Sequence, residues 1–111
     1  MRDERSFSER ITQEVAAWPG VAVDDGELGE LAFKLGRREI GHLHGEHVAH
    51  FSLPKPLWHE LRAEQRIEPH PVFPRAVGPA QRRIATDDDV RDVIALLRVN
   101  YDRLLARQAT G

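Results

Sequence analysis

The chain opens with a helical pattern. Apolar residues recur three or four positions apart, which places them on one side of a helix: Phe7, Ile11, Val15 and Trp18. Ser6 and Glu9 form a capping box at its start, and Pro19-Gly20 is typical of its end. The pattern predicts an N-terminal helix with one buried face.

The next segment alternates apolar and polar residues, which is the period of a half-buried strand. Strands are expected in four places: residues 21–23, 30–36, about 38–44, and 47–53. Gly45-Glu46 separates the last two, and glycine at that position suits a two-residue type II′ turn. The pattern predicts an antiparallel β-meander.

Prolines organise the middle of the chain. Pro54 and Pro56 stop the sheet, and Pro56 suits the first position of a helix that fades near Gln65. Four more prolines make residues 66–81 an extended loop. Residues 82–85 (RRIA) are a candidate last strand.

The C-terminal segment is a long amphipathic helix. Thr86 caps it, with Asp89 three residues further on. Its expected buried face is continuous: Val90, Val93, Ile94, Leu97, Tyr101, Leu104 and Leu105. The predicted fold class is therefore α+β, in which an N-terminal helix, a β-meander, a short helix, a proline-rich loop, a candidate strand and a long helix follow in order. We expect the helices to pack on one face of the sheet.

Composition narrows the classes of protein. A length of 111 residues predicts a single domain, residues 1–111. The formal charge of −2 gives no general attraction to nucleic acid or to an anionic membrane, so neither is an expected partner. No cysteine is present, which excludes disulfides and thiolate metal sites. The N-terminus does not resemble a signal peptide, and we expect a cytoplasmic protein.

Histidines are concentrated in one segment. Residues 41–50 (GHLHGEHVAH) hold four of the six in the chain. A two-residue turn at 45–46 would pair His44 with His47 and His42 with Ala49. One face of the hairpin would then carry a mixed set: Ile40, His42, His44, His47, Ala49 and Phe51. His50 would point to the opposite face.

Three chemistries suit such a cluster. Imidazoles bind divalent metals, transfer protons near neutral pH, and bind anions or polar small molecules with help from arginine. Four arginines are close enough in the sequence to be considered: Arg37, Arg38, Arg82 and Arg83. Histidines on a half-buried strand also serve simply as hydrogen-bonded structural residues, and this reading stays open.

The proline-rich loop carries one more candidate. If it folds across the strand face, His70 completes a set with His42 and His44, either as three metal ligands or as catalytic groups. Glu68 would orient His70. The expected ligand-binding residues are therefore His42, His44, His47, Glu68, His70 and Arg38, and a divalent metal is the candidate cofactor.

The sequence resembles the luciferase domain family of small bacterial and fungal proteins. The resemblance rests on five features: WPGV (18–21), GRREIGHLHG (36–45), Glu68 with His70, DDDV (87–90) and Tyr101. It runs from Trp18 to about Leu105. Five positions match residues that recur in the family: Gly41, His42, His44, Gly45 and His70. The family name implies a shared architecture, and no flavin or luciferin motif in this chain supports light emission.

This chain departs from the family pattern at three places. The family usually has aspartate at the position of His50 and a second histidine at the position of Pro71. It tends to have a Ser-Gly-Trp turn where this chain reads RAVGPAQ (75–81). A site built from those groups would be altered here.

Two functions remain in view from the sequence. The first is a small soluble domain whose histidine-lined pocket on a sheet face binds a small molecule or a divalent metal. The alternative is a non-enzymatic interaction protein, in which the same face or the last helix forms a homodimer or contacts another partner. The sequence does not decide whether the domain is an enzyme.

Overall fold

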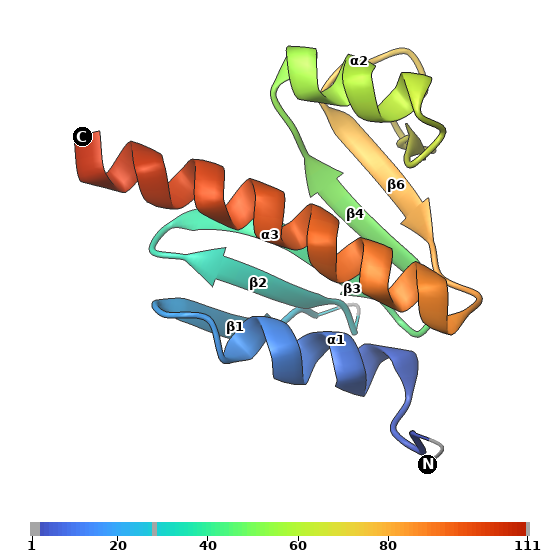
Figure 1. Ribbon diagram of the computed structural model, residues 1–111, viewed down its shortest axis with the longest axis vertical. Coiled ribbons are helices and arrows are strands. Elements are labelled where there is room, and N and C mark those ends of the chain that lie inside the picture. Colours follow the sequence, from blue (N-terminus) through green and yellow to red (C-terminus); the bar gives the residue numbers. More distant parts are fainter. Residues whose placement is uncertain (1–2, 28, 111) are drawn as a thin grey trace.

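The computed structural model describes residues 3–27 and 29–110. These residues form an antiparallel sheet in the order β1-β2-β3-β4-β6-β5, together with three helices (Figure 1). The elements follow in chain order: α1 (Phe7–Ala16), β1 (Val21–Asp25), β2 (Leu31–Leu35), β3 (Arg38–His44), β4 (Val48–Ser52), α2 (Lys55–Ala63), β5 (Glu68–Pro69), β6 (Pro79–Arg83) and α3 (Asp87–Thr110). The α+β class predicted from the sequence is confirmed.

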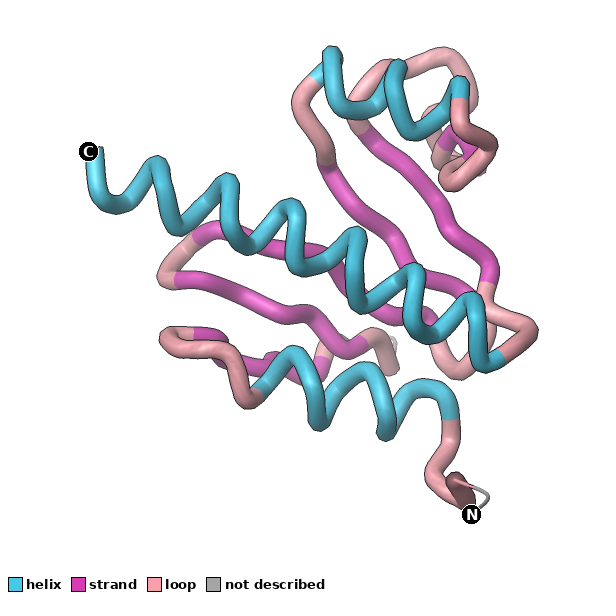
Figure 2. The backbone as a smooth tube through the Cα atoms, in the orientation of Figure 1, coloured by secondary structure: helices cyan, strands magenta, loops and turns pink. Residues whose placement is uncertain are grey.

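The helices leave one face of the sheet open. Helices α1 and α3 lie side by side across the other face, and α2 lies beside the ends of β4 and β6 (Figures 1 and 2). The indole nitrogen of Trp58 in α2 donates to the carbonyl of Pro79, 2.9 Å away. Within the described part of the chain, no helix covers the second face. Even α3 lacks an apolar stretch long enough to cross a membrane.

Both predicted helix caps are present. Ser6 and Glu9 form the capping box of α1. The hydroxyl of Thr86 accepts from the backbone amide of Asp89, whose carboxylate accepts from the amide of Thr86 in return. One part of the expected buried face of α3 is wrong, because Leu105 is 42% exposed.

A turn near the N-terminus anchors α3. The Tyr101 hydroxyl donates to the carbonyl of Pro19 over 2.7 Å, and its ring lies against Trp18. Gly20 follows with φ of +82°, a left-handed conformation that glycine adopts without strain. The WPG segment and Tyr101 are thus parts of one contact between α3 and the start of β1.

The proline-rich segment is more ordered than the sequence predicted. It contains β5, and β6 begins at Pro79 and ends at Arg83 rather than spanning 82–85. Proline donates no ladder hydrogen bond, but an edge strand and the first residue of a strand both tolerate this. Pro69 lies in the edge strand β5, and Pro79 is the first residue of β6.

The predicted register of the β3–β4 hairpin is wrong by one residue. The loop holds three residues, 45–47, and the pairs are His42 with His50, Leu43 with Ala49, and His44 with Val48. Leu43 and Ala49 therefore share the face that packs under the helices, where both are buried. His50 joins His42 on the opposite face, and His47 lies in the loop.

A β-bulge in β3 explains a second difference. Gly41 pairs with Phe33 and Glu39 pairs with Lys34, so Ile40 has no partner on β2. The extra residue breaks the simple alternation of side chains. Ile40 is therefore buried in the core rather than on the histidine face, and Glu39 reaches the same side as His42.

Helix α3 holds the bulge closely. The Asn100 side-chain amide donates to the carbonyl of Ile40 over 2.7 Å, and Asn100 is fully buried. A Cβ at Gly41 would lie 2.7 Å from a methyl of Leu97 and 3.0 Å from the carbonyl oxygen of His50. Glycine and asparagine therefore bring the helix and the bulged strand into direct contact.

Replacing Asn100 with alanine should destabilise the fold by about 1–3 kcal/mol, because the buried carbonyl of Ile40 loses its donor. Urea unfolding of the variant and of Val99→Ala, a change at the exposed neighbouring position, measures the difference. An Asn100→Ala protein as stable as the Val99→Ala protein would contradict this assignment.

Candidate metal-binding site

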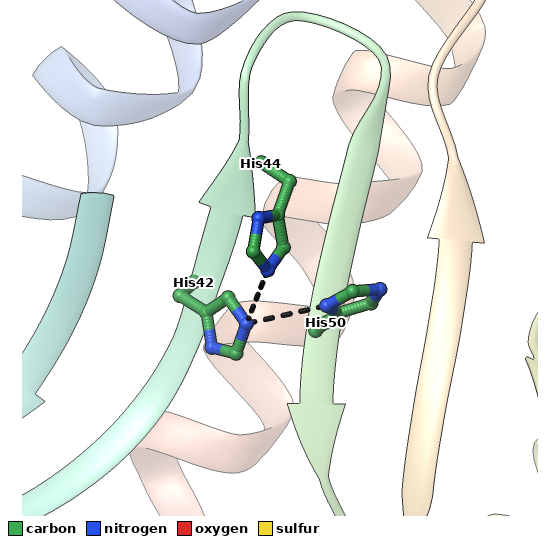
Figure 3. A group of neighbouring side chains, drawn as sticks. All are labelled: His42, His44 and His50. Carbon is green, nitrogen blue, oxygen red and sulfur yellow. Dashed lines mark hydrogen bonds between the residues drawn. The ribbon is translucent and has the colours of Figure 1, made fainter. Parts of the chain in front are cut away.

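Three imidazole rings converge on the open face of the sheet. His42 and His44 come from β3 and His50 from β4, and their rings point toward one another while α3 lies behind the strands (Figure 3). The Nε2 atom of His42 lies 3.1 Å from Nε2 of His44 and 3.2 Å from Nδ1 of His50. One nitrogen from each ring lies within 4.8 Å of the other two.

The bulge orients the first ring. Glu39 Oε2 lies 3.0 Å from Nδ1 of His42. A carboxylate accepts hydrogen bonds, so Nδ1 of His42 carries the proton. In a neutral imidazole the other nitrogen then has a free lone pair, and Nε2 of His42 presents that lone pair to the cluster.

Strand β6 orients the second ring. Nε2 of His50 lies 3.0 Å from the amide oxygen of Gln81, which pairs with His50 across β4 and β6. An amide oxygen only accepts, so Nε2 of His50 is the donor and Nδ1 has the lone pair. His50 and His42 therefore face each other through two lone pairs 3.2 Å apart.

This geometry suits a cation. Two lone pairs at that distance repel unless a proton or a metal ion lies between them. Nitrogens bound at 2.0–2.1 Å to a tetrahedral zinc are about 3.3 Å apart. The separations from His42 to His44 and from His42 to His50 are close to this value, and all three nitrogens lie within 4.8 Å of one another. Ligating histidines also commonly donate their other N–H to a carboxylate or carbonyl oxygen, as His42 and His50 do.

The surroundings of His50 disfavour its protonation. Burial lowers the pKa of His50, and the neighbouring histidines lower it further, while its bond to Gln81 opposes the change. The hydrogen bond from His42 lowers the pKa of Glu39 against partial desolvation. At neutral pH the site thus combines an ionised carboxylate with a neutral His50, which has a lone pair available for a metal.

His70 lies beside the cluster. It follows β5, and its ring centre is 4.2 Å from that of His50. Desolvation lowers the pKa of His70, and charge on His42 and His44 lowers it further. The structure thus groups His42 and His44 with His50, and it places His70 at the edge of this group, against His50.

Three other expected residues lie outside the cluster. His47 donates from Nδ1 to the carbonyl of Ile84 over 2.9 Å. Arg38 lies near α3. Desolvation is the main cause of the lowered pKa of Arg103 on that helix, and the charge of Arg38 lowers this pKa further. Glu68 accepts from Arg83, whereas Nδ1 of His70 accepts from the amide of Val72. Glu68 therefore does not orient His70.

Three residues of the site were not predicted from the sequence: His50, Glu39 and Gln81. A signal for His50 was available, since Ala49 and Phe51 alternate with it and both need the core face. No pattern in the sequence indicated the bulge that brings Glu39 to His42. Gln81 was hidden because its segment was expected to be a loop.

An open hollow adjoins the cluster. Its volume is about 460 Å³, and it extends over β1, β2 and β3. Seven of its nine lining residues have polar or charged side chains, and the complete set is Asp24, Asp25, Gly26, Glu30, Ala32, Lys34, Glu39, His42 and His44. A small molecule could therefore reach the histidine nitrogens from solvent.

The metal-free fold should lose stability as pH falls from about 7 to 5. The pKa of His50 is lower in the folded chain than its ordinary 6.5, so the unfolded chain takes up the proton more readily. The contribution of His50 to the stability of the fold is present above about pH 6.5, and it is lost as the pH falls toward the pKa of His50 in the folded chain. Urea unfolding in the presence of a chelator should show that the free energy of unfolding of His50→Gln changes less with pH than that of the parent protein.

His59→Gln serves as the control, because His59 lies on α2 beside Trp58. Equal slopes in His50→Gln and the parent protein would show that His50 does not drive this pH dependence.

Comparison with known proteins agrees with the resemblance seen in the sequence. No curated protein and no solved structure shows a significant match to the chain. The family model described as the luciferase domain matches residues 37–100, which is more than half of the 111 residues. The match spans the three converging histidines and His70. The chain therefore belongs to the luciferase domain family.

Proposed function

We propose that this protein binds a divalent transition metal through Nε2 of His42, Nε2 of His44 and Nδ1 of His50. Imidazole nitrogens suit zinc, copper, iron and nickel, and a site with three protein ligands leaves a coordination position open. That position faces the open side of the sheet, where it would take water or a small molecule.

One observation carries the proposal. Glu39 and Gln81 each accept the N–H of one histidine, so the remaining lone pairs of His42 and His50 are directed at each other. The protein thereby places two unprotonated nitrogens 3.2 Å apart on a partly exposed surface. A bound cation turns this repulsion into attraction, and His44 supplies a third nitrogen at the same point.

A proton shared between His42 and His50 would also relieve the repulsion. A shared proton and a metal compete for the same lone pairs, so metal binding should weaken as pH falls.

The homodimer considered from the sequence would cover the same face of the sheet. Light scattering of each sample distinguishes such a dimer from a monomer that binds metal.

Each of the three histidines should be essential for metal binding. Isothermal titration of untagged protein with Zn²⁺ or Co²⁺ should give a 1:1 complex. Alanine at position 42, 44 or 50 should lower the metal affinity by more than about 100-fold. This exceeds the roughly 10–100-fold loss that follows removal of a hydrogen-bond partner outside the metal ligands. Far-ultraviolet circular dichroism checks that each variant folds.

The controls are His47→Ala and His59→Ala, which remove imidazoles outside the cluster. Their metal affinity should equal that of the parent. Absence of metal uptake by the parent, or equal losses in the control variants, would refute the proposed site.

Glu39 should strengthen metal binding without touching the metal. Glu39→Gln keeps an acceptor for Nδ1 of His42 but removes the charge that makes the ring more basic. Metal affinity should fall by about 10-fold, and Glu39→Ala should cost up to about 100-fold. Glu68→Gln is the matched control, because that carboxylate pairs with Arg83. Equal affinity in Glu39→Ala and the parent would contradict this role.

A further inference from the structure

The hydrogen bond inside the 70–73 segment assigns a separate role to His70. The backbone amide of Val72 donates to Nδ1 of His70 over 3.1 Å. A nitrogen that accepts a hydrogen bond carries no proton, so the neutral ring has its proton on Nε2. His70 therefore differs from His42, whose Nε2 has a lone pair.

This tautomer makes His70 unsuitable as a metal ligand. A histidine that binds metal through Nε2 carries its proton on Nδ1. That N–H would face the backbone N–H of Val72, and the two donors would repel each other. The ring nevertheless lies 4.2 Å from His50, centre to centre. His70 thus offers an N–H donor at the edge of a cluster in which His42 and His50 offer lone pairs.

The same segment exposes apolar surface. Val72 is 70% exposed and Phe73 is 54% exposed, the two highest values among the large apolar residues that the structure describes as exposed. The Phe73 ring centre is 5.4 Å from that of His70. Contiguous exposed apolar surface that is rimmed by polar residues often marks an interaction site or a ligand-binding groove. Pro71 and Pro74 restrict the backbone on either side, which lowers the entropy lost when a ligand binds.

Building on the proposed metal function, we infer that the site takes a small ligand with two chemical parts. An oxygen-donor head occupies the open metal position and accepts a hydrogen bond from Nε2–H of His70. An apolar body packs against Phe73. His70 is then a positioning residue for the ligand head, and Phe73 selects for the body.

Matched hydroxamates test both parts on the full-length protein loaded with Co²⁺. Acetohydroxamate carries the oxygen donors on a single methyl group, and benzohydroxamate carries the same donors on an aromatic ring. Visible absorption of Co²⁺ follows each titration. The parent should bind both probes and prefer benzohydroxamate by about 2- to 10-fold, the scale of one aromatic contact.

Two substitutions at His70 separate its hydrogen bonds. The Asn side-chain oxygen can accept from the amide two residues ahead, so His70→Asn keeps the loop bond and removes the Nε2 donor. His70→Gln places an amide donor near the Nε2 position. His70→Asn should lower the affinity for both hydroxamates about 2- to 10-fold and leave the affinity for Co²⁺ unchanged. His70→Gln should retain part of the hydroxamate affinity that His70→Asn loses.

Phe73→Ala should remove only the preference for benzohydroxamate. Val99→Ala, at an exposed apolar position on α3, should leave both probes unaffected. If His70→Asn lowers Co²⁺ affinity or changes the spectrum of the Co²⁺ protein without a probe, His70 is a metal ligand and the inference is wrong. Unchanged probe binding in His70→Asn and Phe73→Ala would also overturn it. In both cases the proposed metal site stands, whereas a parent protein that takes up no Co²⁺ refutes the metal site itself.

Discussion

The pairing of Leu43 with Ala49 across β3 and β4 is the contact on which the candidate site depends. Both side chains are buried under the helices, and side chains on a strand alternate between faces. His42 and His50, each next to one of these residues, must then share the opposite face. A shift of one residue would move an entire set of side chains to the wrong side of the sheet. Core packing thus decides which imidazoles meet.

The β-bulge at Ile40 connects the core to the chemistry. It lets Ile40 enter the core while Glu39, its neighbour, reaches Nδ1 of His42 on the other face. Asn100 of α3 binds the bulged carbonyl from beneath the sheet. Bulges are frequent next to functional sites because they redirect a side chain. Here the redirected side chain is the carboxylate that fixes the tautomer of His42.

Hydrogen bonds to residues outside the cluster divide three of the four neighbouring histidines into two kinds. Glu39 and Gln81 leave His42 and His50 with inward lone pairs, which attract a cation. The Val72 amide leaves His70 with an N–H group, which suits a ligand that carries negative charge. The proposed metal binding and the proposed ligand recognition therefore fall on different rings, even though the sequence presents them as one type of residue.

The sequence by itself determined the helices, their caps, the α+β class and the concentration of histidines near the β3–β4 turn, because these follow from local periodicity and capping. It did not determine the register of that hairpin. Ile40 and Leu43 are three residues apart and both lie in the core, which strict alternation forbids and only a bulge allows. The position of a bulge depends on contacts with Phe33, Leu97 and Asn100, which are distant in sequence. Only the tertiary structure could therefore bring His50 and Glu39 to His42, since these neighbours are chosen by packing across the sheet.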